Sequence, residues 1–270
     1  MKKTESGHGY HEVAAGESGH QTRFWIYLPS VVKARETPCV VIAPAGTRMF
    51  HALELSEGDQ DEHTPWVEAG FVVVAYEIES RFEDTMTGKE IATNVKAFLA
   101  AKSGVENGKA AVSFAQRLPQ VDASRIYVVG HSSAATLALQ LAAADRRIGG
   151  VVAFAPVVDL GAHFGEEFPA TLDGIVKGPS KKLFARSPHK LVSKLRQPLY
   201  LFCAKDDDVA PPARPAEFTG ALQKRNKRVV LKSVDAGGHY EPMIDAGIPG
   251  AIEWVRSGMK ATPKAGDSKK

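Results

Sequence analysis

The chain has 270 residues and a mass of 29.0 kDa, a length that fits one large domain or two small ones. Hydrophobic residues make up 44% and charged residues 24%, a balance typical of globular chains that excludes a wholly disordered protein. The 34 basic and 31 acidic residues leave a formal net charge of +3, which is too small to favour nucleic acid as a partner. Since no apolar run approaches the roughly 20 residues of a membrane span, we expect no membrane partner either.

The N-terminal residues leave the compartment open. The segment MKKTESGHGYH starts with basic residues but has no apolar stretch of the kind that an intact signal peptide needs. This fits a cytoplasmic protein, and it fits equally a secreted one whose signal peptide has been removed. The two cysteines, Cys39 and Cys203, lie within apolar runs, which predicts buried free thiols and provides neither a disulfide framework nor a zinc site.

Short apolar runs alternate with helical segments along the chain. The runs that predict strands span residues 23–28, 39–43, 71–76, 126–129, 151–155, 199–203 and 229–234. The segments that predict helices span residues 90–99, 110–118, 133–144, 215–225 and 248–257, with a break expected near 104–108. Strands that are apolar on both faces are typical of a parallel sheet covered by helices. We therefore predict one α/β domain over residues 1–258, with a mainly parallel sheet flanked by helices on both faces, and a disordered tail over 259–270.

One connection is much longer than this alternation requires. About forty residues, 156–197, separate the fifth and sixth predicted strands, whereas ordinary connections have about 4–6. We expect a helix over 188–195 and a partial cap over a site from the remainder. Phe164 and Phe168 could supply an apolar wall that binds substrate, although packing in the core explains either residue equally well.

The segment Gly130-His131-Ser132-Ser133-Ala134 follows a predicted strand and opens an alanine-rich helix. A strand, a sharp turn and a helix are the setting of a nucleophile elbow, in which a strained serine is exposed at the turn. The residues two before and two after this serine must be small, as Gly130 and Ala134 are. Ser132 is therefore the candidate nucleophile.

A serine hydroxyl needs a base, and the base needs an acid that orients it. His239 lies on the loop Asp-Ala-Gly-Gly-His after the last predicted strand and is the candidate base. The sixth strand is followed by three aspartates, 206–208. Asp206 is the candidate acid because Val209 stands three residues after it, and Asp207 takes its place if the register slips by one. All three side chains would then project from the carboxyl ends of strands, where open α/β sheets bind ligands.

An acyl-transfer site also needs donors for the negative charge that develops on the carbonyl oxygen. One donor should be the backbone N–H of Ser133, the residue after the nucleophile. The second should come from the loop Pro-Ala-Gly-Thr at 44–47, in which the sequence does not decide between Gly46 and Thr47.

The elbow, the acid loop and the histidine loop together resemble the α/β-hydrolase superfamily over roughly residues 20–258. The run D-D-D-V-A-P-P and the spacing of Ser132, Asp206 and His239 resemble prolyl-oligopeptidase-like and dienelactone-hydrolase-like catalytic domains. The dienelactone type has a cysteine nucleophile where this chain has serine. The prolyl oligopeptidase type carries an N-terminal propeller, for which about twenty residues before the first predicted strand are too few. In this fold, two strands would separate those of Cys39 and Cys203.

The resemblance implies a serine hydrolase that cleaves carboxylic esters through an acyl-enzyme, with a small-molecule ester as its partner. A small peptidase or amidase of the prolyl-oligopeptidase-like type is the alternative, and a non-catalytic binding protein on the same fold is a third. We expect no cofactor and no metal, since no histidine and carboxylate share ligand spacing on a credible helix. Residues 156–197 mix charges among few large apolar side chains, unlike a lipase lid, so we expect a small or medium ester.

Overall fold

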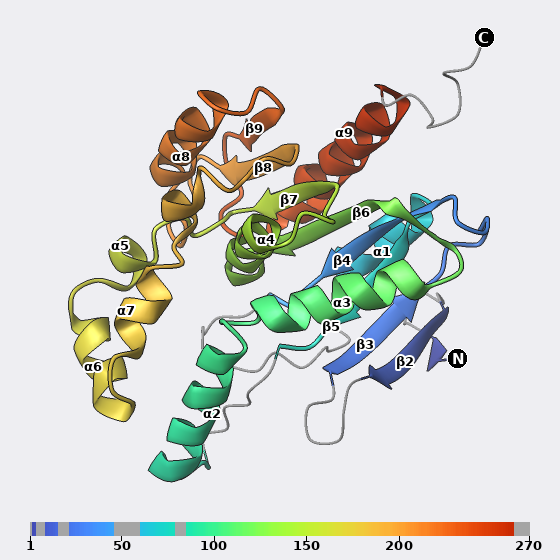
Figure 1. Ribbon diagram of the computed structural model, residues 1–270. Coiled ribbons are helices and arrows are strands. Elements are labelled where there is room, and N and C mark those ends of the chain that lie inside the picture. The colour runs from blue at the N-terminus through green and yellow to red at the C-terminus, as the bar shows by residue number, and fades with distance from the viewer. Residues whose placement is uncertain (1, 4–8, 16–21, 46–59, 79–84, 262–270) are drawn as a thin grey trace.

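The computed structural model of the protein describes residues 2–3, 9–15, 22–45, 60–78 and 85–261 (Figure 1). Nine strands form one sheet in the order β1-β2-β3-β5-β4-β6-β7-β8-β9. The strands are β1 (Lys2–Lys3), β2 (Gly9–Ala15), β3 (Thr22–Tyr27), β4 (Thr37–Ile42), β5 (Val72–Tyr76), β6 (Val121–His131), β7 (Gly150–Phe154), β8 (Leu199–Ala204) and β9 (Val229–Val234). From β5 to β9 all neighbouring strands are parallel, while β1, β2 and β3 form an antiparallel edge. The predicted fold class, an α/β-hydrolase fold, is confirmed.

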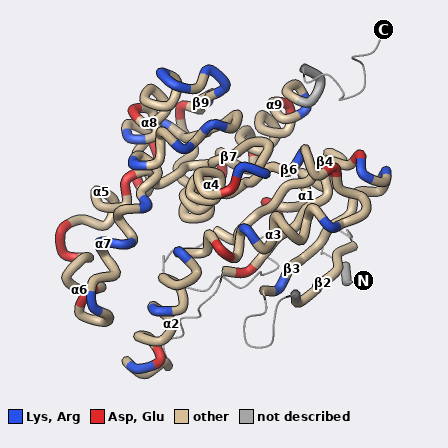
Figure 2. Tube along the Cα trace, viewed as in Figure 1, with Lys and Arg blue, Asp and Glu red and all other residues tan. Residues whose placement is uncertain are grey.

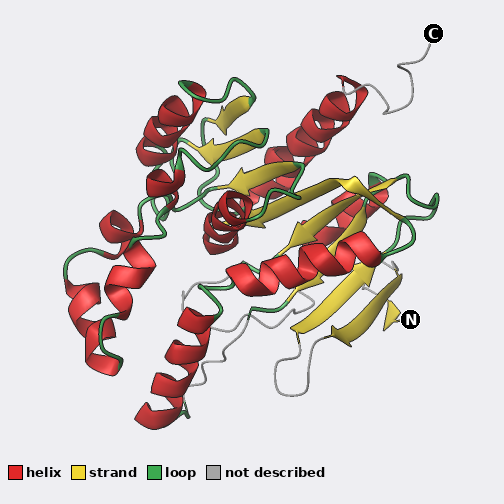
Figure 3. Cartoon of the chain, in the orientation of Figure 1, coloured by secondary structure: helices red, strands yellow, loops and turns green. Residues whose placement is uncertain are grey.

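Helices cover both faces of this sheet (Figure 3). They are α1 (Gln60–Glu68), α2 (Gly88–Ala100), α3 (Val105–Arg117), α4 (Ser133–Ala144), α5 (Leu160–Phe164), α6 (Glu167–Ile175), α7 (Pro179–Phe184), α8 (Ala213–Gln223) and α9 (Ile248–Ala261), with short turns η2 (Pro188–Leu191) and η3 (Met243–Gly247). Successive strand residues point to opposite faces. Val41 accordingly packs in the cluster that contains α3, α4 and α8, whereas its neighbour Val40 packs with α1 and α9. The sheet therefore lies between two separate hydrophobic cores.

The segment 156–197 is largely helical and forms its own small core. Leu160, Leu172 and Leu183, from α5, α6 and α7, bury against Val95 of α2. The ring of Phe168 stacks on that of Phe164 at 4.3 Å between centroids and lies beside Phe184. In Figure 1 this group of helices stands away from the sheet, below α8. Its apolar side chains therefore pack chiefly with one another and with α2.

Some elements differ from the sequence prediction for identifiable reasons. The strand β2 pairs with β3, and Tyr10 stacks on Trp25 at 5.0 Å, but its mixed polar and apolar residues hide the strand in the sequence. Helix α1 contains Pro65 and carries little apolar periodicity, yet it buries Trp66 completely. The helix expected over 188–195 is only the four-residue turn η2. Helix α9 continues to Ala261, past the predicted boundary at 258, and residues 262–270 lie outside the described chain.

Charges of both signs occur along the same helices and loops, with a basic run at the turn between α8 and β9 (Figure 2). Elsewhere acidic residues accompany the basic ones, as where Arg147 pairs with Asp145 and Arg125 pairs with Asp122. None of the helices in the described part of the chain is long and apolar enough to cross a membrane.

Cys39 and Cys203 are both free and buried, as predicted. They lie on β4 and β8, and β6 and β7 separate these strands in the sheet. Three spacings of about 4.8 Å hold the two residues far beyond the roughly 7 Å between Cα atoms that a disulfide tolerates. We expect a thiol titration of the unfolded protein without reductant to count two free groups per chain. A count of zero in a monomeric chain would contradict this strand order.

Candidate active site

The nucleophile elbow is formed where β6 ends and α4 begins. Ser132 has φ 53° and ψ −118°, a left-handed conformation that is costly for a residue other than glycine. Its backbone N–H donates to the carbonyl oxygen of Phe154 on β7 at 2.9 Å, which fixes the turn to the neighbouring strand. The predicted strand, turn and helix are present, and they hold Ser132 in the strained geometry of an elbow.

Gly130 explains why this turn tolerates so little bulk. A Cβ atom on Gly130 would lie 2.4 Å from the backbone carbon and oxygen of Ala134. Real carbon atoms do not approach backbone this closely, and the first turn of α4 cannot move away without breaking the helix. The sequence pattern of small residues on both sides of the serine therefore has a direct steric cause.

His239 is oriented by Asp207. Its Nδ1 lies 2.8 Å from Oδ2 of Asp207, and the Asp207 side chain is completely buried. The other carboxylate oxygen, Oδ1, accepts backbone N–H groups of Val209 and Ala210 at 3.0 and 2.8 Å. A carboxylate so placed can only accept, so Nδ1 of His239 carries the proton and Nε2 is left for the nucleophile.

The structure brings Asp207, rather than the predicted acid Asp206, into contact with His239. The Asp206 side chain turns to the exposed side of the loop and accepts the N–H groups of Gly237 and Gly238 at 3.0 and 2.9 Å. These two hydrogen bonds lower the pKa of Asp206. Because β8 ends at Ala204 and two further residues form the turn, Asp207 rather than Asp206 takes the buried position beside His239. Asp207 was the alternative if the register slipped by one.

His131, immediately before Ser132, joins the elbow to the histidine loop. Its Nε2 lies 2.8 Å from the carbonyl oxygen of His239, and its ring lies 4.6 Å from the His239 ring between centroids. The ring also meets Tyr240 edge-on at 5.4 Å. His131 is 3% exposed, and burial lowers its pKa to about 4. No role for His131 could be predicted from the sequence, since the position between the glycine and the serine of an elbow carries no fixed residue type.

The predicted oxyanion donors are only partly described. Ser133 is the first residue of α4, and helix N-termini present backbone N–H groups that favour negative charge. The second donor, Gly46 or Thr47, lies outside the described residues. Of the predicted oxyanion residues, Ser133 alone can be placed beside Ser132.

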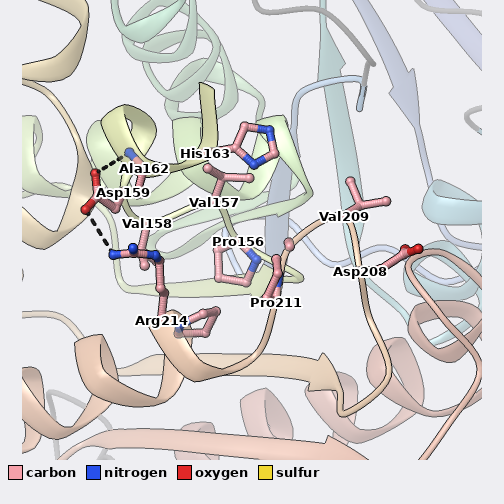
Figure 4. Close-up of a pocket in the computed structure, with 12 residues that line it drawn as sticks. Pro156, Val157, Val158, Asp159, Ala162, His163, Asp208, Val209, Pro211 and Arg214 are labelled. Carbon is pink, nitrogen blue, oxygen red and sulfur yellow. Dashed lines mark hydrogen bonds and ion pairs between the residues drawn. The ribbon is translucent and has the colours of Figure 1, made fainter. Parts of the chain in front are cut away.

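An open pocket of about 430 Å³ lies beside the acid loop. It is lined on one side by residues from 156–163, after β7, and on the other by residues from 208–215, which follow Asp207 (Figure 4). Arg214 reaches across to Asp159 at 3.3 Å, and Asp159 also caps α5 through the Ala162 N–H. The pKa of His163, which lines the pocket, is lowered by burial and by the charge of His239. The pocket adjoins the pair of Asp207 and His239, because Asp208 and Val209, which follow Asp207 directly, line it.

Phe164 and Phe168, the predicted substrate-binding residues, do not line this pocket. Both are partly buried against the small core of Leu160, Leu172 and Leu183. Their observed contacts are those of the other role expected for them, packing in a core. The pocket instead takes its apolar wall from prolines and valines such as Pro156, Val157 and Val209. No residue pattern in the sequence marks these positions as a binding site, apart from their closeness to the ends of β7 and β8.

Residues 59–249 match the Prolyl oligopeptidase family, a stretch that covers well over half of the chain. The chain belongs to this family. None of the curated proteins compared with the chain matches it.

Solved structures of similar fold include peptidases and esterases. Acylaminoacyl peptidase from Pyrococcus horikoshii aligns with a TM-score of 0.65 and 15% identity over 94% of this chain and 41% of that one. Puromycin hydrolase aligns with a TM-score of 0.72 and 18% identity, over 95% of this chain and 40% of that one. Acetyl xylan esterase 1 from Thermoanaerobacterium aligns with a TM-score of 0.68 and 15% identity, over 92% of this chain and 83% of that one. This chain thus spans about two fifths of the two longer structures, and at these identities the likeness shows the fold alone.

Among the described residues, no group of three or more histidine, cysteine, aspartate or glutamate side chains is arranged to hold a metal ion.

Proposed function

We propose that this protein hydrolyses small or medium carboxylic esters through an acyl-enzyme formed on Ser132. The observation that carries the proposal is the 2.8 Å contact between His239 and the completely buried Asp207. His131, the residue before the strained Ser132, contacts the same His239. Strain at Ser132 and a buried carboxylate both cost stability, and such costs are typical of functional sites.

In the proposed reaction, Oγ of Ser132 attacks the ester carbonyl carbon while its proton passes to Nε2 of His239. The tetrahedral intermediate then breaks its bond to the alcohol oxygen, which leaves with that proton. Water attacks the acyl-enzyme, gives a proton to His239, and the returning proton releases Ser132 with the carboxylic acid. Asp207 keeps the ring of His239 in the required tautomer and stabilises the imidazolium that forms twice in this cycle.

Developing negative charge on the carbonyl oxygen needs donors that are already in place. The Ser133 N–H at the start of α4 is the proposed first donor, and Gly46 or Thr47 is the proposed second. No metal or cofactor enters the proposed steps. A small-molecule ester is the proposed partner.

The pocket supports a small or medium substrate. Its volume of about 430 Å³ is near the lower end of ordinary ligand sites, and its walls are mainly proline, valine and alanine. The ion pair of Asp159 with Arg214 offsets one acidic charge, and Asp208 remains at the rim, so an anionic group is disfavoured there. An uncharged acyl or alcohol portion of a few carbons fits these walls best.

Ester cleavage is also less demanding than amide cleavage for this arrangement, because an alkoxide needs less help than an amine from His239 as general acid. Amide hydrolysis by the same residues is the alternative that the family name favours. Higher kcat/KM on aminoacyl amides than on every ester of a matched series would replace the ester proposal.

Narrowing the pocket should change selectivity among esters. We expect the native protein to cleave p-nitrophenyl acetate and butyrate, and Ala162→Trp to lower kcat/KM for the longer hexanoate about tenfold more than for the acetate. Ala162 lines the pocket, and the added indole would occupy space that the longer chain needs. Steady-state kinetics over the two- to eight-carbon series measure the effect.

Ala216→Trp is the matched control, because Ala216 is exposed on α8 and does not line the pocket. It should leave the ratio of the two kcat/KM values unchanged. Equal losses on all chain lengths in Ala162→Trp, with native selectivity retained, would mean that this pocket does not hold the substrate.

A further inference from the structure

The histidine loop, residues 235–242, is held from two sides by groups that the proposed reaction does not use. On the inner side, His131 of the elbow contacts the carbonyl oxygen of His239 at 2.8 Å. On the outer side, Asp206 accepts the N–H groups of Gly237 and Gly238. Residues 237, 238 and 239 of the loop are therefore each held by one of these hydrogen bonds. The partner side chains come from the ends of two different strands, His131 from β6 and Asp206 from the turn after β8.

The inner contact fixes both the position and the protonation of His131. A carbonyl oxygen only accepts, so Nε2 of His131 must carry a proton and donate it. With its pKa lowered to about 4 by burial, the ring is otherwise neutral above that pH and does not repel the imidazolium form of His239 4.6 Å away. It can thus act as a fixed, uncharged donor throughout a catalytic cycle.

The glycines of the loop explain why such fastening is needed. Gly237 and Gly238 have φ of 126° and 74°, and a Cβ atom on Gly237 would lie 2.6 Å from Pro242. Two adjacent glycines give the backbone before His239 more conformational freedom than any other pair. Without external contacts, the loop could move the imidazole relative to both Asp207 and Ser132.

We propose that His131 and Asp206 are positioning residues that hold His239 against Asp207 and Ser132. His131 does so through the His239 carbonyl and ring, and Asp206 does so through the two glycine N–H groups. The inference rests on the proposed function, because His239 has to be the base for its position to control the rate. In this arrangement the residue before the nucleophile is coupled directly to the base of the same site.

Substitution of His131 tests the inner contact. His131→Leu removes the donor at similar volume, whereas His131→Gln keeps an N–H near the position of Nε2. We expect kcat on p-nitrophenyl butyrate to fall 10- to 100-fold in the leucine variant with KM unchanged, because small misplacements of a catalytic group cost about this much. The glutamine variant should stay within about threefold of the native protein, at an equal content of folded protein by circular dichroism.

A second background separates positioning from a purely structural role. Asp207→Asn already leaves His239 in the wrong tautomer. Adding His131→Leu to Asp207→Asn should then lower kcat by less than about threefold, since the effects of two residues that act on the same group are not additive. The same loss in both backgrounds, or equal losses for leucine and glutamine, would overturn the inference for His131.

Substitution of Asp206 tests the outer contact, and it also tests the inference if the His131→Leu variant does not fold. Its side chain is exposed, so Asp206→Ala removes the two hydrogen bonds without opening a cavity. We expect kcat to fall about tenfold with KM unchanged, and again a much smaller loss in the Asp207→Asn background. Native kcat in Asp206→Ala would contradict the outer contact. An inactive native protein would instead contradict the proposed function, so the two failures are distinguishable.

Discussion

Replacing Asp207 with asparagine is expected to slow ester turnover about 10⁴-fold, while Asp206→Asn should cost about tenfold or less. The amide nitrogen at position 207 would donate to Nδ1 of His239 and force its proton onto Nε2, where it blocks the acceptance of the Ser132 proton. Asp206 accepts only backbone N–H groups on the exposed side of the loop, and asparagine can keep one of these hydrogen bonds. The kcat of each purified variant on p-nitrophenyl butyrate measures the difference.

Glu217→Gln is the control for the loss of one negative charge, because Glu217 is exposed on α8 and does not line the pocket. It should keep nearly native kcat. A large loss at position 206 with little loss at 207 would restore Asp206 as the acid and would mean that the observed contact at 2.8 Å is not the working one.

Ser132→Ala is expected to reduce ester turnover by a factor of about 10⁴ or more, to the residual rate of binding and oxyanion stabilisation alone. The change removes one oxygen atom from a half-buried residue, and it leaves the hydrogen bond from the residue 132 N–H to Phe154 intact. The variant should therefore fold with a native circular dichroism spectrum and differ only in rate.

Ser257→Ala, on the exposed surface of α9, is the matched control for loss of a serine hydroxyl and should keep native kcat. If Ser132→Ala retained more than about a tenth of the native rate, the nucleophile would have to be another group, and the acyl-enzyme on Ser132 would be ruled out.

Most of the sheet could be predicted from the sequence because its strands are apolar on both faces. Val40 and Val41 show why, since each packs in a different core and neither position admits a polar residue. The strand β2 was missed because beyond Gly9 and Tyr10, which pair with the two-residue strand β1, it has β3 as its described neighbour, and this part of the sheet tolerates polar residues such as Glu12. Helix α1 was missed because Pro65 signals a helix end, whereas the burial of Trp66 and Val67 stabilises the helix in the folded chain.

The site was predictable where a rule fixes residue type as well as position. Position 130 requires glycine because a Cβ atom there would lie 2.4 Å from the backbone of Ala134. This requirement allows the elbow to be recognised from a single sequence. Three adjacent aspartates are chemically equivalent in sequence. Only the length of the turn after β8 decides that Asp207, rather than the predicted Asp206, is buried beside His239. His131 and the pocket residues depend on contacts between distant loops, for which a single sequence has no pattern.

Labelling with a fluorophosphonate probe tests the central claim most directly, because the probe forms a covalent bond only with an activated serine. Intact mass analysis of the native protein should show one adduct per chain, and peptide mapping should place it on Ser132. The Asp207→Asn variant should be labelled far more slowly, and Ser132→Ala should not be labelled. A native protein that stays unlabelled, or an adduct mapped to any other residue, would contradict the account.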